Sequence, residues 1–221
     1  GVVAGAAHKA ALTLRERIAI IAAGDLNTPP ADLEFVGGSV RSKANPDNTV
    51  ALGRTAAKAH WSPLSIPSQA GGGLRETATW SLPELTEPDM DDRVNSSGAY
   101  GFIFDFCGVE ICPDTDAVRI DNYVTMHDAG TLLNPPLADG QIRGGFAHGL
   151  GAALLEEFIY DDDGSFLSGN FADYLPPTAN EIPPITILHD CSPSPFTPLG
   201  AKGVGEGNCM STPVCIANAV A

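Results

Sequence analysis

The segment 200–207 constrains this chain more than any other, because four of its eight residues are glycine. It reads Gly200-Ala201-Lys202-Gly203-Val204-Gly205-Glu206-Gly207. Glycine is unfavourable inside both helices and strands, so the segment predicts a tight loop that carries one cation and one carboxylate. A carboxylate with so little side-chain cover can act as a general base. A turn with a solvated glutamate is the alternative interpretation, and the residues alone leave both open.

Two phosphate-binding motifs are excluded by the spacing in this loop. A P-loop requires GxxxxGK followed by Ser or Thr, but Gly203 follows Lys202. The dinucleotide pattern GxGxxG fails because Asn208 stands where its third glycine should be. We expect the last helix to begin near Ser211, which can cap it, with Pro213 in its first turn. Free backbone N–H groups at such a helix start would favour an anion.

A second cluster of glycines falls in the predicted helix 137–157. Five lie within twelve residues: Gly140, Gly144, Gly145, Gly149 and Gly151. Each costs a helix about 1 kcal/mol relative to alanine. Close approach of another backbone or of a flat ligand is the physical reason to remove so many Cβ atoms. Gln141 adds an amide that can donate and accept hydrogen bonds. Tight helix packing beside a solvated Gln141 is the alternative.

Charge and cysteine content exclude several classes of protein. The 221 residues contain 12 Lys and Arg against 27 Asp and Glu, a formal net charge of −15. This charge opposes nucleic-acid binding and docking on an anionic membrane. No run of about 18 apolar residues predicts a membrane span. The five cysteines form no CxxC pair, so neither a zinc site nor an iron–sulfur site is predicted. Reduced thiols in the cytoplasm are the expected state.

The remaining pattern mixes helices with hairpins. We expect helices over 5–23 (ending at Gly24) and 50–60, hairpins over 33–41, 99–124 and 158–172, and strands over 74–81 and 184–190. No regular βαβ alternation occurs, so the predicted class is α+β, with mixed sheet hairpins and packed helices. The pair His127-Asp128 ends a predicted strand and is either catalytic or a structural hydrogen-bonded pair.

Several motifs resemble, in their order, one known family. They are Asn134-Pro135, Gly140-Gln141-Ile142-Arg143-Gly144-Gly145, Gly149-Leu150-Gly151 with Glu156-Glu157, Asp173-Tyr174 and Lys202-Gly203-Val204-Gly205-Glu206-Gly207. This order is similar to the molybdenum-cofactor-binding large subunit of the xanthine dehydrogenase, aldehyde oxidase and aerobic carbon monoxide dehydrogenase family. The resemblance covers essentially the whole chain and is most specific over 99–221.

The resemblance implies a place for this chain in a two-domain molybdopterin-binding subunit. Residues 1–98 would be part of the molybdopterin-binding region, with a helix, a hairpin and a loop. Residues 99–221 would be its C-terminal part, which carries the catalytic glutamate loop. The chain matches only the last third of such a subunit, so we expect it to be a fragment or one chain of a split subunit.

The resemblance also implies roles for particular residues. Glu206 is the expected catalytic base. The residues expected at the cofactor are Gln141, Lys202, Gly203, Val204, Gly205, Gly140 and Gly144. No protein side chain is expected to bind the molybdenum, which the pterin dithiolene holds in this family.

The implied activity is that of the C-terminal part of a molybdenum hydroxylase. Such an enzyme oxidises a small aldehyde, an N-heterocycle or a related molecule with water as the oxygen source. The implied cofactor is molybdopterin, as the cytosine dinucleotide, with electrons passing to 2Fe-2S and FAD groups on partner chains or domains. Partners would be the remainder of the molybdenum subunit and the iron–sulfur and flavin subunits of a cytoplasmic hetero-oligomer. Alternatives are an aerobic carbon monoxide dehydrogenase large subunit and a non-catalytic cofactor-binding or assembly subunit.

Overall fold

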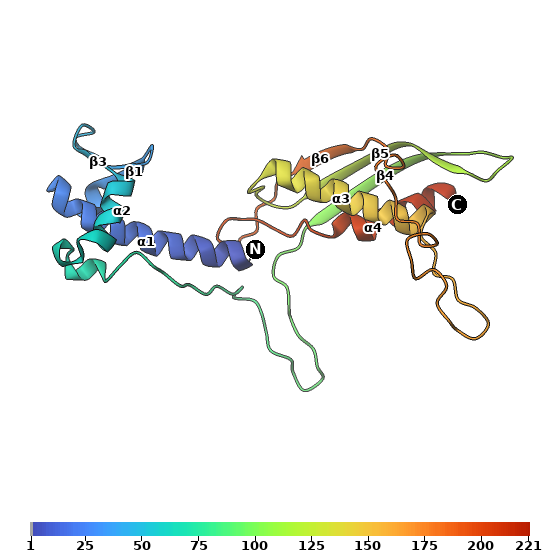
Figure 1. Cartoon of the computed structure of the whole chain (residues 1–221), viewed down its shortest axis with the longest axis horizontal. Coiled ribbons are helices and arrows are strands. Elements are labelled where there is room, and N and C mark those ends of the chain that lie inside the picture. The colour runs from blue at the N-terminus through green and yellow to red at the C-terminus, as the bar shows by residue number, and fades with distance from the viewer. Residues whose placement is uncertain (1) are drawn as a thin grey trace. The chain divides into compact units, whose positions relative to one another are not determined.

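The computed structural model describes residues 2–221 and divides them into two compact units, Val2–Ser81 and Leu82–Ala221. In the first unit an antiparallel sheet of three short strands lies between two helices in the chain (Figure 1). Its elements are α1 (Val2–Leu26), β1 (Leu33–Val36), β2 (Ser39–Ser42), β3 (Thr49–Ala51) and α2 (Leu52–Trp61). Three single 3-10 turns, Pro30–Asp32, Pro63–Ser65 and Ser68–Ala70, join or follow them.

Helix α1 continues past Gly24, so the predicted end at that residue is wrong. Leu26 is only 6% exposed and packs with Leu33 and Val40 in one core cluster. Burying a leucine contributes about 1.5–3 kcal/mol, which exceeds the cost of one helical glycine. Asn27 then takes the left-handed conformation, with φ 45°, that commonly ends a helix.

Residues 74–81 form no strand, contrary to the prediction from their alternation. They lie against α1 instead, where Arg17 pairs with Glu76 at 2.8 Å. Trp80 contacts Gly5 so closely that a Cβ on the glycine would come within 2.7 Å of the indole. The apolar side chains Leu74, Ala78 and Trp80 are partly buried in this arrangement, without a partner strand.

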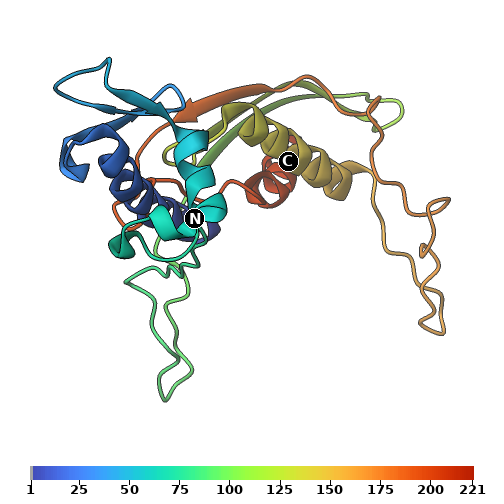
Figure 2. The same cartoon turned by 60° about the vertical axis from the view of Figure 1, so that its left-hand side comes forward.

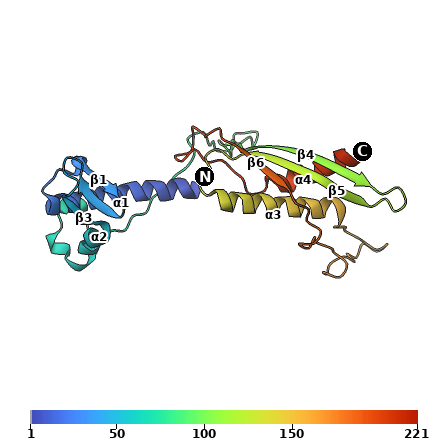
Figure 3. The same ribbon diagram turned by 90° about the horizontal axis from the view of Figure 1, so that it is seen from above.

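The second unit contains a mixed sheet covered on one face by two helices (Figures 1 and 2). Strand β4 (Phe102–Ile111) pairs antiparallel with β5 (Val118–Asp128), and β5 pairs parallel with β6 (Thr186–Asp190). A parallel neighbour requires a crossover, which α3 (Pro135–Leu154) provides by running beside the strands (Figure 3). The last helix, α4 (Gly207–Val220), packs against β4 and α3. The predicted α+β class with a mixed sheet is confirmed.

The core of this unit lies between β5 and the two helices. Its fully buried members are Ile120, Tyr123, Phe146, Leu150 and Ile216. These residues come from β5, α3 and α4, so one cluster joins segments that are nearly a hundred residues apart in sequence. The core fixes the sheet, α3 and α4 as one body, and the glycine-rich loop 200–207 leads directly into α4.

One further prediction for this unit is wrong and another is confirmed only in part. Helix α4 begins at Gly207, so Pro213 lies inside it and Ser211 does not cap it; the Ser211 hydroxyl donates to the Gly207 carbonyl at 3.3 Å. The hairpin predicted over 158–172 forms only near its turn, where Tyr160 and Phe166 make a single antiparallel bridge and the Leu167 N–H donates to the Ile159 carbonyl at 2.8 Å.

Candidate functional site

Close backbone contacts fix the first half of the glycine-rich loop. Ala201 forms an isolated bridge with Gly130, just past the end of β5. The Lys202 N–H donates to the Ala129 carbonyl at 2.8 Å. Gly101, just before β4, lies so near the loop that a Cβ there would meet the Gly203 carbonyl oxygen at 2.8 Å. The loop is therefore held at one end of the β4–β5 ribbon.

The Lys202 side chain forms a buried ion pair rather than a free cation. Its Nζ lies 2.8 Å from Asp128 Oδ2 and 2.6 Å from Ser192 Oγ. The lysine and aspartate side chains are 8% and 13% exposed. Asp128 also accepts hydrogen bonds from the Ser192 hydroxyl and from the Gly130 and Ser192 N–H groups. Lysine has three donors, so one N–H remains for a ligand.

The environment of Asp128 keeps its carboxylate ionised. Burial by itself raises the pKa of the Asp128 carboxyl, but the hydrogen bonds from Lys202, Ser192 and Gly130 outweigh it and hold this pKa well below its usual range. The structure thus separates the sequence pair His127-Asp128: Asp128 anchors the loop, whereas His127 binds Asn208 on α4. The two side chains thus have separate partners, and His127 also lines the cavity of Glu206.

Gln141 connects α3 to the residue that precedes Glu206. Its Nε2 donates to the Gly205 carbonyl oxygen at 2.8 Å across 64 residues of sequence. The helix that carries it is held at its start by Asn134, whose side chain accepts from the Leu137 N–H at 3.3 Å. The structure therefore brings together two of the site residues predicted from sequence, Gln141 and Gly205.

Two adjacent cavities meet at the loop. Gln141, Lys202, Val204 and Gly205 line one of about 420 Å³. Glu206 lines the other, of about 360 Å³, which shares Val204 and Gly205 with the first. Glu206 is exposed, and its side chain makes no capping hydrogen bond to α4. Its carboxylate is thus available to a group in the second cavity.

The glycines of α3 and of the loop divide into two groups. At Gly149 a Cβ would lie 2.7 Å from both the Asn208 carbonyl oxygen and Thr212 Cβ, so helix packing requires this glycine. A Cβ on Gly145 would lie 3.3 Å from Asn208 Cβ, a tighter contact than usual, and one on Gly151 would meet Pro177 Cδ at 2.6 Å, outside α4. A Cβ on Gly140, Gly144, Gly203 or Gly205 would meet nothing within 4 Å, and none of the four has a positive φ.

The second group coincides with the four glycines that the resemblance places at the cofactor. Neither backbone conformation nor packing within residues 2–221 requires glycine at these positions. A surface without Cβ atoms lets a flat ligand approach the backbone closely, so the residues present fit a planar cofactor. Gly140 and Gly144 line neither of the two cavities.

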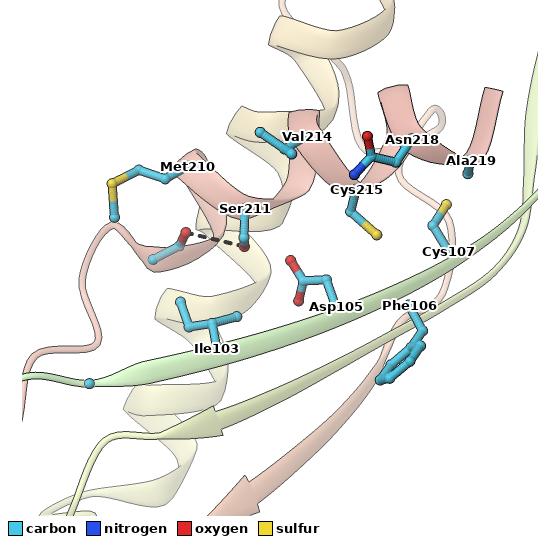
Figure 4. A pocket seen from close by; sticks show the side chains of 12 residues that line it. Ile103, Asp105, Phe106, Cys107, Met210, Ser211, Val214, Cys215, Asn218 and Ala219 are labelled. Carbon is cyan, nitrogen blue, oxygen red and sulfur yellow. Dashed lines mark hydrogen bonds between the residues drawn. The ribbon is translucent and has the colours of Figure 1, made fainter. Parts of the chain in front are cut away.

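A third and larger cavity, which the sequence analysis did not anticipate, lies between β4 and α4 (Figure 4). It has a volume of about 710 Å³ and shares Ile103, Gly207 and Met210 with the cavity of Glu206. The Asp105 side chain projects into the space between the strand and the helix (Figure 4). No sequence signal could have found this cavity, because its two walls are about a hundred residues apart.

Within residues 2–221, no group of three or more His, Cys, Asp or Glu side chains is placed to hold a metal ion. A metal at this site would need ligands from a cofactor or from outside this range. Over the same residues, every helix is too short or too polar to pass through a bilayer.

Comparison with known proteins decides the family. Residues 1–183 match the model of the molybdopterin cofactor-binding domain. The chain belongs to this family. Over 98% of its length it is 30% identical to the nicotine 6-hydroxylase large subunit of Paenarthrobacter nicotinovorans. Over 98% of its length it is also 32% identical to the carbon monoxide dehydrogenase large chain of Afipia carboxidovorans. It is also 31% identical, over 99%, to the xanthine dehydrogenase molybdenum-binding subunit of Escherichia coli O157:H7. The resemblance drawn from the sequence is thus confirmed.

Solved structures agree with this assignment of a molybdopterin cofactor-binding chain. Quinoline 2-oxidoreductase from Pseudomonas putida 86 superposes with a TM-score of 0.75 and 32% identity over 92% of the chain. A Cu,Mo-CO dehydrogenase superposes with a TM-score of 0.76 and 30% identity over 97%. The chain spans only about a quarter of the length of these relatives. It covers 25% of the nicotine 6-hydroxylase and carbon monoxide dehydrogenase sequences and 24% of the chain in each of the two solved structures. The family model ends before the glycine-rich loop, whereas these alignments cover nearly the whole chain.

Proposed function

We propose that this chain forms one side of the molybdopterin site of a molybdenum hydroxylase and supplies its catalytic base. The enzyme would oxidise a small aldehyde, an N-heterocycle or a related molecule, with water as the oxygen source. One observation carries the proposal: Gln141 of α3 and Lys202 of the glycine-rich loop line one cavity, and Glu206 of the loop lines the next. The glycines along this path leave the backbone open to a flat ligand.

The cofactor would be held by local donors rather than by the overall charge. The chain has a formal net charge of −15, which repels an anionic pterin phosphate. The third N–H of Lys202 and the backbone along Gly203–Gly205 are the groups that would bind it, with Gln141 holding the loop in place. When bound, the molybdenum cofactor supplies a two-electron acceptor. We propose the cytosine dinucleotide form, as implied by the resemblance.

Glu206 would remove a proton from the water-derived nucleophile during oxidation of the substrate. The carboxylate points from a loop whose flanking peptides are fixed, so little reorganisation is needed when the proton is transferred. A positioned general base contributes about 10²–10⁴-fold to a rate. After transfer, the protonated carboxyl can release its proton to solvent, because the side chain is exposed.

The family membership also supports a proposal for the assembly. We propose that residues 1–98 and 99–221 are both parts of the molybdopterin-binding region, completed by the remainder of the molybdenum subunit. One relative, from Paenarthrobacter nicotinovorans, is subunit gamma of a 6-hydroxypseudooxynicotine dehydrogenase complex. We propose iron–sulfur and flavin partners carrying 2Fe-2S and FAD. The five cysteines are free thiols, a state that favours the cytoplasm.

A second candidate activity is oxidation of carbon monoxide. It is favoured by the 32% identity to the Afipia carboxidovorans large chain and by the TM-score of 0.76 to a Cu,Mo-CO dehydrogenase. Turnover of the complete enzyme with carbon monoxide, compared with aldehydes and N-heterocycles, separates the two activities.

Glu206→Gln in the complete enzyme tests the role of the base. The amide keeps the shape of the side chain but cannot accept a proton, so turnover should fall about 10²–10⁴-fold. Molybdenum content and the pterin nucleotide released by acid should stay near normal. Glu84→Gln makes the same chemical change at an exposed carboxylate of this unit and serves as the matched control. Normal turnover of a molybdenum-replete Glu206→Gln enzyme would support the non-catalytic alternative.

A further inference from the structure

We propose that Asn208 is a positioning residue that fixes the orientation of Glu206, an inference that rests on the proposed role of Glu206 as base. Asn208 is the second residue of α4 and is only 1% exposed. In the sequence, Asn208 stands out only as the residue that breaks a dinucleotide-binding pattern. In the structure it is the point at which the catalytic loop is attached to the sheet.

The Asn208 amide is held at both ends by strand residues. Its Oδ1 lies 2.6 Å from His127 Nε2, and its Nδ2 donates to Thr125 Oγ1 at 3.1 Å and to Asp105 Oδ1 at 3.5 Å. A side-chain amide has one accepting oxygen and one donating nitrogen. Because partners of the right kind face each end, the amide has one orientation.

The chemistry of the amide also determines the state of His127. Asn208 Oδ1 can only accept, so His127 Nε2 carries the hydrogen in this contact. Burial lowers the pKa of His127, although its contact with Asn208 acts in the opposite direction. His127 is 2% exposed, and this burial favours the neutral ring with its hydrogen on Nε2.

Only Gly207 separates Asn208 from Glu206 in the chain, so the position of Asn208 constrains that of Glu206. Gly207 lies so close to Ile103 that a Cβ would overlap Ile103 Cδ1, and the same Cβ would lie 3.5 Å from His127 Cε1. On the other side of Glu206, Gln141 holds the Gly205 carbonyl at 2.8 Å. The peptides before and after Glu206 are thus anchored to α3 and to the sheet. The remaining freedom of its carboxylate is that of its own side-chain torsions.

A neighbouring polar contact provides a matched control. The Tyr123 hydroxyl donates to Asp105 Oδ2 at 2.7 Å and lies 3.1 Å from the Thr212 hydroxyl. It joins the same strands to the same helix, but more than one turn farther along α4 from Glu206. Tyr123→Phe therefore weakens the contact of α4 with the sheet and removes no direct hydrogen bond of the Asn208 amide, although both side chains contact Asp105, through different carboxylate oxygens.

The test compares Asn208→Ala with Tyr123→Phe in the complete enzyme. A misplacement of about 1 Å can cost about 10²-fold in rate, so kcat of Asn208→Ala should fall by that order. Its KM should change by less than about twofold, since substrate binding is retained. Molybdenum and pterin content should stay normal. Tyr123→Phe should lower the melting temperature and leave kcat unchanged.

A second pair of variants covers the case in which Asn208→Ala does not fold. His127→Gln keeps an N–H that can reach Asn208 Oδ1, whereas His127→Leu removes it. Kcat should be largely retained in His127→Gln and reduced in His127→Leu. Equal kcat in these two variants, or an equal loss of kcat in Tyr123→Phe and Asn208→Ala, would overturn the proposal.

Adding Asn208→Ala to the Glu206→Gln enzyme distinguishes the positioning role of Asn208 from the proposed role of Glu206 as base. If Asn208 acts through Glu206, Asn208→Ala should cause no further loss of kcat in Glu206→Gln. A further loss of about 10²-fold there would show that Asn208 acts by another route, and the positioning role would be wrong. Full activity of Glu206→Gln alone would instead contradict the proposed function.

Discussion

The ion pair Arg17–Glu76 of the first unit and the ion pair Lys202–Asp128 of the second differ in how deeply they are buried. In the first unit, Arg17 and Glu76 pair at the surface with side chains 30% and 21% exposed. In the second, Lys202 and Asp128 pair with side chains 8% and 13% exposed, beside the buried cluster of His127 and Asn208. A buried polar group must be satisfied in one geometry, whereas an exposed pair can rearrange in water. Precise placement is therefore concentrated in the unit that carries Glu206.

Breaking the buried pair should have the largest effect on stability. Asp128→Asn removes the negative charge that compensates Lys202, and an uncompensated buried charge costs about 3–5 kcal/mol. Hydrogen exchange of β5 and of the loop 200–207 should report this loss, together with lower cofactor content. Glu76→Gln breaks the exposed pair of the first unit and should cost less than about 1 kcal/mol. Equal losses of stability in Asp128→Asn and Glu76→Gln would contradict the difference between the two ion pairs.

The two groups of glycines in α3 should respond oppositely to alanine. Gly149→Ala places a methyl group against Asn208 and Thr212, and such overpacking costs about 1–3 kcal/mol. Gly144→Ala meets nothing within 4 Å and should stabilise the helix by up to about 1 kcal/mol. We expect Gly144→Ala to lower molybdenum and pterin content in the complete enzyme. Chemical denaturation and metal analysis measure the two effects, and full cofactor loading of Gly144→Ala would weaken its assignment to the cofactor.

The smallest expected effect is a pH dependence confined to the second unit. Burial lowers the pKa of His127, whereas the unfolded chain has a histidine pKa of about 6.5. Below that pH the unfolded state binds more protons than the folded state, so stability falls as pH decreases from about 6.5. Hydrogen exchange of α4 between neutral and mildly acidic pH should show this loss. His127→Gln should remove it, and an unchanged pH profile in that variant would assign the effect to another group.

Much of the site could be predicted from sequence because its signals are local. The four glycines within eight residues required a loop, and the order of motifs indicated Gln141, Lys202 and Glu206 together. The structure places Gln141 and Lys202 at one cavity and Glu206 at the adjoining one. The partners of Lys202 could not be predicted, because Asp128 and Ser192 reach it from elsewhere in the chain. Lys202, which is expected at the pterin, also anchors the loop through Asp128 and Ser192.

The failed predictions share one cause. Residues 74–81 alternate like a strand but lie against α1, partly buried. Helix α4 starts before its apparent capping residue because Gly207 and Asn208 fit against the sheet. In each case a contact between distant segments outweighed a preference of about 1 kcal/mol or less. Asn208 was missed for the same reason, since nothing in its neighbours indicates that three strand side chains will enclose its amide.

The sequence by itself determined the α+β class, the family, the glycine-rich loop and the identity of the carboxylate that the loop presents. These depend on residue type and order along the chain. Only the tertiary structure decided which glycines are required by packing, which cation is neutralised, and which buried amide holds the loop beside Glu206. Those facts depend on distances between segments up to about a hundred residues apart, and the folded core alone sets them.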